Sequence, residues 1–138
     1  LLVTLIITYL RLNINRGSAP RAERLAVHLP FSIYLGWITV ATVANLTDVL
    51  YYLNWNGFGI SAVAWMSIIL LAVLVIVALV NFTRRDIGYP LVILWALIGI
   101  GLKHAAISSV AIPTWITFGL VALSLVAAFF TKKGRAKA

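Results

Sequence analysis

The chain has 138 residues, of which 63% are hydrophobic and only 10% are charged, and its mean hydropathy is +1.07. Soluble domains carry about 25% charged residues, and a domain of this length leaves a large part of its surface in water. These values exclude a soluble enzyme, a nucleic-acid-binding domain and a disordered chain, and they indicate a protein embedded in a bilayer. The net charge of +8 comes from short basic clusters between apolar runs, a pattern typical of membrane topology signals.

The apolar stretches predict an all-α fold, a polytopic transmembrane helix bundle that forms a single domain over residues 1–138. Residues within them do not alternate between polar and apolar as they would in a membrane strand. The first stretch, 1–10, is too short to span, because a spanning helix needs about 20 residues; we interpret it as the end of a preceding helix. Complete helices are expected over 25–53, 60–82, 89–106 and 113–130, followed by a basic tail over 131–138.

Positive charge alternates along the connections between these helices. Residues 11–24 contain four arginines, 54–59 contain no Lys or Arg, 84–85 are both arginine, the next connection has only Lys103, and the tail has four basic residues. Cytoplasmic connections are enriched in Lys and Arg. The pattern therefore predicts a multi-pass protein of the cell (inner) membrane, with the first and third connections and the C-terminus in the cytoplasm.

The helix expected over 25–53 carries an unusual stripe of polar and aromatic residues. At 100° per residue, one face receives Tyr34, Trp37, Ala41, Asn45, Asp48 and Tyr52. A lipid-facing stripe would consist of Leu, Val and Ile, so this face should contact protein or a ligand. Two interpretations stay open at this point: a ligand-lining face, or polar residues that hold packed helices together through hydrogen bonds.

The same helix resembles the last-helix signature of the TspO/MBR family, the translocator or tryptophan-rich sensory proteins. That signature has Tyr-Leu-x-Trp, an apolar stretch with Ala-Thr, and then Asn; the matching residues here are Tyr34, Trp37, Ala41, Thr42 and Asn45. The segment from Pro30 to Trp37, taken with the turn 54–59, is similar to a larger prokaryotic branch of the family, of which this chain would be the C-terminal part. The family's Trp-Pro-rich loop does not occur in this chain, and its Pro before the Tyr is replaced by Ile33.

The resemblance implies a membrane-embedded protein that binds or senses a hydrophobic ligand, such as a tetrapyrrole or a sterol-like lipid. We expect no catalysis, and we assign no definite cofactor beyond the ligand itself. The expected partners are membrane lipids, the ligand and either a second copy of the chain in a homodimer or a larger membrane complex. We expect no nucleic acid as a partner. The predicted ligand-binding residues are Tyr34, Trp37, Ala41, Asn45 and Asp48. Two alternatives remain: an accessory structural subunit of a respiratory or photosynthetic membrane complex, or half of a transporter.

Charge and metal chemistry add one further expectation. Asp48 and Lys103 are the only formal charges expected near the non-cytoplasmic side, and an unpaired charge within a membrane is costly. We therefore predict that they pair, with separate solvation of each as the alternative. The chain has no cysteine, and the predicted topology puts His28 and His104 at opposite membrane faces, so no metal site is expected.

Overall fold

The computed structural model describes the backbone of residues 1–16 and 18–135, with side chains described up to residue 130. Every regular element in these ranges is helical, which confirms the all-α class. The elements are α1 (Leu2–Arg11), α2 (Arg21–Glu23), a π-helical turn (Arg24–His28), α3 (Leu29–Tyr52), a 3-10 turn (Gly57–Gly59), α4 (Ala62–Arg84), α5 (Gly88–Lys103) and α6 (Ser108–Arg135). The tail predicted over 131–138 is helical up to Arg135, and its last three residues lie outside the described residues.

Three helical segments are long and apolar enough to cross a bilayer: Arg21–Tyr52, Ala62–Arg84 and Ser108–Phe130. The helix expected over 89–106 is shorter, because α5 has 16 residues. Such a helix is about 24 Å long, against a hydrocarbon core of about 30 Å. The following helix begins at Ser108 rather than at Pro113, which places this proline in the second turn of α6.

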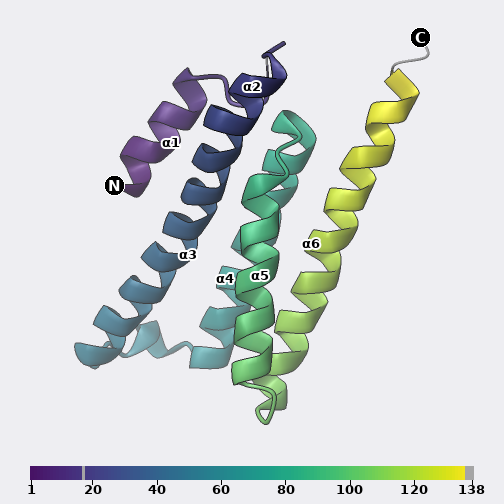
Figure 1. The fold of residues 1–138 in the computed structure, drawn as a ribbon. Coiled ribbons are helices and arrows are strands. Elements are labelled where there is room, and N and C mark those ends of the chain that lie inside the picture. Colours follow the sequence, from purple (N-terminus) through teal and green to yellow (C-terminus); the bar gives the residue numbers. More distant parts are fainter. Residues whose placement is uncertain (17, 136–138) are drawn as a thin grey trace.

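The helices run alternately up and down, so that the connections gather at two ends of the bundle (Figure 1). The end of α1, the loop before α2, the loop between α4 and α5, and the end of α6 lie at one end. The turn over 54–59 and the loop between α5 and α6 lie at the other. The arginine-rich connections therefore share one end, as the alternating charge predicts; the compartment that each end faces stays a prediction.

Close packing of α5 against its neighbours depends on glycine. A Cβ added to Gly88 would lie 2.9 Å from the Cβ of Ser32 on α3, and one added to Gly101 would lie 2.8 Å from the Trp115 ring on α6. Real Cβ atoms do not approach other atoms this closely, so both positions require glycine for the observed spacing.

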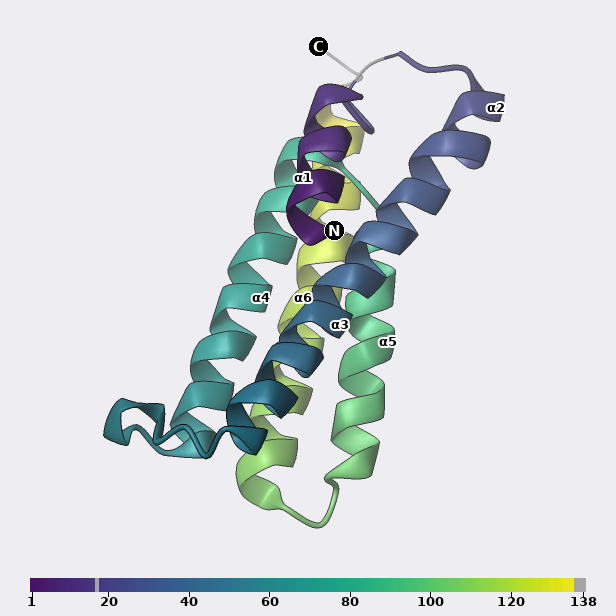
Figure 2. The ribbon, with the colours of Figure 1, turned by 90° about the vertical axis from the view of Figure 1, so that its left-hand side faces the viewer.

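Figure 2 shows α3 crossing α5, with α6 behind them and α1 lying over the upper half of the bundle.

A proline explains the π-helical turn that precedes α3. Pro30 lies in the first turn of α3 and lacks the N–H that would bond to the carbonyl four residues earlier, against which its ring would also clash. Widening the preceding turn, Arg24–His28, into a π turn accommodates such a clash. The helix therefore continues from Arg21 to Tyr52. The basic residues Arg21 and Arg24 lie in its first turns, before the apolar part of α3.

Candidate functional site

An apolar groove lies between α3 and α5. It encloses about 370 Å³, and its lining among the described residues consists of Leu29, Ile33, Trp37, Gly88, Leu91, Val92 and Trp95. The two tryptophan rings have centroids 5.6 Å apart at an interplanar angle of 44°. Trp37 is 47% exposed and Trp95 is 62% exposed, so both rings are open to the surroundings of the bundle as well as to each other.

Helical spacing and glycine packing together create this groove. Leu29, Ile33 and Trp37 follow one another at intervals of four on α3, which places them on one face. Behind them, Gly36 brings α3 against α5, because a Cβ there would lie 3.1 Å from the Cβ of Val92. The helices thus touch along one line, and the larger side chains on the outer side of that line form the walls.

The chemistry of the groove is that of apolar binding. Ligand sites are mostly apolar concavities with a volume of about 300–1,000 Å³, and this groove lies at the small end of that range. No carboxylate, imidazole or hydroxyl group is among its lining residues, and the described part of the chain contains no cluster of three potential metal ligands. The groove can hold an apolar surface against two aromatic faces, and it offers no group for acid–base or metal chemistry.

Of the five residues predicted to bind a ligand, Trp37 lines this groove. Tyr34 precedes it on α3 and is 45% exposed, and Ala41 lies one turn below Trp37, half-buried. Asn45 and Asp48 are exposed further down α3, away from the groove lining. The stripe lies on one continuous helix, and a ligand-binding role for these residues stays a prediction.

Asp48 and Lys103 lie near the same end of the bundle, close to the ends of α3 and α5 (Figure 1). Both side chains are exposed. Within the described side chains, the ion pair that the structure contains joins Glu23 to His28 and does not involve these two residues. Pairing of Asp48 with Lys103 therefore stays a prediction.

A buried carboxylate, Asp86, lies next to the groove, and the sequence pattern did not predict it as a site residue. Asp86 is 1% exposed, and its side chain accepts hydrogen bonds from the Tyr9 hydroxyl (2.5 Å), the Ser32 hydroxyl (2.5 Å) and the backbone N–H groups of Gly88 (3.0 Å) and Tyr89 (3.4 Å). These donors belong to α1, α3 and α5. One carboxylate thus joins three helices at the arginine-rich end.

Arg84 completes this polar cluster without touching the carboxylate directly. Its guanidinium carbon lies 4.9 Å from the centroid of the Tyr9 ring, and it donates to the backbone carbonyl of Ile14 at 3.2 Å. The side chain is 7% exposed, so the charge is held by the aromatic ring and by carbonyl oxygens. Arg84 and Asp86 together attach α1 and the loop after it to the rest of the bundle.

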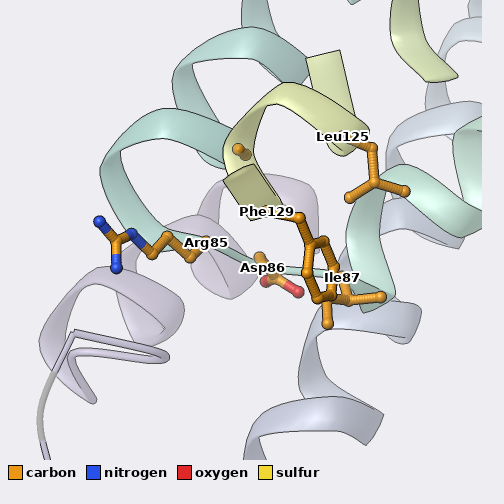
Figure 3. A pocket seen from close by; sticks show the side chains of 6 residues that line it. Arg85, Asp86, Ile87, Leu125 and Phe129 are labelled. Atoms are coloured by element: carbon orange, nitrogen blue, oxygen red, sulfur yellow. The ribbon is translucent and has the colours of Figure 1, made fainter. Parts of the chain in front are cut away.

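A second, smaller pocket of about 40 Å³ lies on the other side of Asp86, lined by Arg85, Asp86, Ile87, Leu125, Ala128 and Phe129. Figure 3 shows the Arg85 side chain directed away from the Asp86 carboxylate, with the Phe129 ring beside Ile87. This volume is well below that of ordinary ligand sites. The groove between α3 and α5 is therefore the candidate site.

The comparisons agree with this picture of a helical membrane protein. A family model described as "TSPO-like protein" matches residues 1–129. The chain belongs to this TSPO-like family. No curated protein and no solved structure matches it. The match confirms the resemblance seen around Tyr34 and Trp37, and it extends from α1 through most of α6.

Membership of the TSPO-like family establishes, at the level of the family, a membrane-embedded protein of the ligand-binding or sensing kind. It names no particular ligand. In this TSPO-like chain, Trp95 and Gly88 are among the groove residues that the sequence did not single out, and both belong to a different helix from the signature. A signal for Asp86 existed: a lone Asp two residues before Gly88 is typical of a residue that caps a helix N-terminus.

Proposed function

We propose that this TSPO-like protein binds a largely apolar, planar ligand in the groove between α3 and α5, without catalysing a reaction on it. The observation that carries the proposal is the pair of tryptophans at the lower end of the groove, one from each wall, with ring centroids 5.6 Å apart. Aromatic side chains bind flat ring systems through large contact areas and favourable stacking geometry. A tetrapyrrole or a sterol-like lipid has such a ring system.

The groove recognises the apolar part of a ligand, because its lining is apolar. Because the seven lining residues are apolar, ligand affinity should depend on apolar contact area and ring stacking. Polar groups of the ligand would have to extend out of the groove. Tyr34 on α3, 45% exposed, supplies a hydroxyl on the predicted binding face, and we assign it this orienting role.

The test compares two aromatic residues that are exposed to similar degrees. Protoporphyrin IX and a fluorescent sterol are titrated separately against the purified chain and against Trp37→Ala, with Phe82→Ala on α4 as the control; Phe82 is 53% exposed and lies outside the groove. Loss of one stacking ring and its contact area should weaken binding about tenfold. Phe82→Ala should bind like the parent chain. Equal affinity of Trp37→Ala and Phe82→Ala for both probes would refute the proposed site.

A second candidate function rests on the lower half of α3. Asn45 and Asp48 are exposed there, and polar residues on a membrane helix usually face protein or water. This favours an accessory subunit whose α3 packs against another membrane protein. Purification in mild detergent distinguishes the two functions, since an accessory subunit co-purifies with a larger complex in fixed stoichiometry and a self-sufficient binding protein does not.

We also propose that the arginine-rich end faces the cytoplasm and that the host membrane is the cell (inner) membrane. The proposal is supported by the gathering of both basic connections and the end of α6 at one end of the bundle (Figure 1), together with the positive-inside rule.

A further inference from the structure

The groove has a direction relative to the membrane. Its upper end, at Leu29 and Gly88, lies at the arginine-rich end of the bundle, and its lower end is formed by Trp37 and Trp95. Eight residues separate Leu29 from Trp37, a length of about 12 Å along the helix. One half of a bilayer's hydrocarbon core is about 15 Å thick. The groove therefore extends through most of one leaflet.

Two arginines continue the α3 wall of the groove above Leu29. The backbone N–H of Leu29 donates to the carbonyl of Arg24, and the N–H of Arg24 donates to the carbonyl of Arg21. Arg24 therefore lies one turn above Leu29, and Arg21 lies one turn above Arg24. The π turn thus places Arg24 directly above the groove. Both arginine side chains are exposed, and a hydrocarbon core that begins near Leu29 places them among the lipid headgroups.

Neither arginine forms an ion pair with an acidic residue in the described part of the chain. Glu23 lies 3.7 Å from the His28 ring nitrogen, and Asp86 is buried and occupied by hydroxyl and N–H donors. An arginine fork binds phosphate oxygens in a bidentate manner. The site therefore combines an apolar channel of leaflet depth with two exposed arginines that form no ion pair at its headgroup end.

From this combination we propose that the groove holds one acyl chain of an anionic phospholipid from the arginine-bearing leaflet, with its phosphate bound by Arg21 and Arg24. A free phosphate ion would leave the apolar part of the site uncovered, whereas a phospholipid fills both parts. The lipid site does not depend on the proposed function. Because both occupants use the same groove, a bound ligand would displace the acyl chain.

The experiment uses phospholipids with brominated acyl chains, which quench tryptophan fluorescence on contact, so that Trp37 and Trp95 report occupancy of the groove. The chain is reconstituted in phosphatidylcholine vesicles that contain a small fraction of brominated phosphatidylglycerol or, separately, of brominated phosphatidylcholine. Arg21→Gln with Arg24→Gln is compared with Arg11→Gln with Arg85→Gln. Both double variants lose the same charge at the same end of the bundle, and the second pair lies outside the groove's α3 wall.

In the parent chain, half-maximal quenching should need about 30-fold less of the anionic than of the zwitterionic brominated lipid, given about 1 kcal/mol for each of the two arginines near an anionic lipid surface. This preference should disappear in the Arg21/Arg24 variant and persist in the Arg11/Arg85 variant. It should also disappear with Trp37→Phe and Trp95→Phe, because the remaining tryptophans lie outside the groove.

Three results would overturn the lipid site: no preference in the parent chain, equal loss of preference in both arginine variants, or full retention in the Arg21/Arg24 variant. Equal loss would mean general attraction of anionic lipid to the basic end. Circular dichroism of each variant verifies that the helices are retained. Failure of porphyrin and sterol binding in zwitterionic detergent would refute the proposed function and leave the lipid result unaffected.

Discussion

Removal of the Asp86 carboxylate should destabilise the bundle far more than removal of an exposed carboxylate. In Asp86→Ala, the hydroxyls of Tyr9 and Ser32 and the N–H groups of Gly88 and Tyr89 lose their acceptor, and the site is 1% exposed. Leaving a buried polar group unsatisfied costs about 1–3 kcal/mol, and breaking a buried charged network costs about 3–5 kcal/mol. Since the hydroxyls can turn to other acceptors, we expect a total loss of about 3–5 kcal/mol.

The measurement is thermal unfolding in detergent, followed by circular dichroism. A loss of this size in a chain of 138 residues should lower the midpoint temperature by about 10–17 °C. Asp48→Ala is the matched control, because it removes the same charge from an exposed position on α3 and should change stability by less than about 0.5 kcal/mol. Asp86→Asn, which keeps one carbonyl oxygen as acceptor, should fall between the two.

A double-mutant cycle separates the contribution of α1. Tyr9→Phe removes one hydroxyl donor to Asp86 and keeps the aromatic ring beneath Arg84. Because both substitutions break the same hydrogen bond, their effects on the unfolding free energy should not add, and the coupling should be about 1–3 kcal/mol. If Asp86→Ala unfolds at the same temperature as Asp48→Ala, the carboxylate does not hold the helices together and the reasoning is wrong.

Two further predictions concern packing and topology. Gly88→Ala should lower the unfolding free energy by about 1–3 kcal/mol, because the new Cβ would lie 2.9 Å from that of Ser32; Gly99→Ala, whose Cβ would meet nothing within 4 Å, should not destabilise, and equal effects would contradict the close contact of α3 with α5. In this cysteine-free chain, a cysteine at Asn56 should react with a membrane-impermeant maleimide in intact cells and one at Gly134 should not; the opposite labelling would reverse the proposed orientation.

Much of the architecture could be predicted from local sequence, because hydropathy and charge act over short distances along the chain. The apolar runs predict the helices, and the alternating basic connections predict which ends lie together, as the structure confirms (Figure 1). Boundaries were less predictable. The helix expected to begin at Pro113 begins at Ser108, because proline favours the first turn of a helix without being confined to it.

The candidate site was predicted only in the part that belongs to one helix. The stripe on α3 contains Trp37, and the helical period alone placed it there. Its partner Trp95 is 58 residues further along the chain, and the ring contact exists because Gly36 and Gly88 let α3 and α5 approach closely. No local pattern encodes which two helices pack together.

The Asp86 cluster shows the same division more sharply. Local sequence determines that an Asp before Gly88 can cap α5. Its hydroxyl partners, Tyr9 and Ser32, are 77 and 54 residues away along the chain, and only the tertiary structure brings them to one carboxylate. The sequence by itself determined a helical protein that must lie in a membrane, because composition fixes the solvent that the chain prefers. The groove and the buried carboxylate were decided by tertiary packing, because each is built from residues of separate helices whose side chains meet only when the bundle closes.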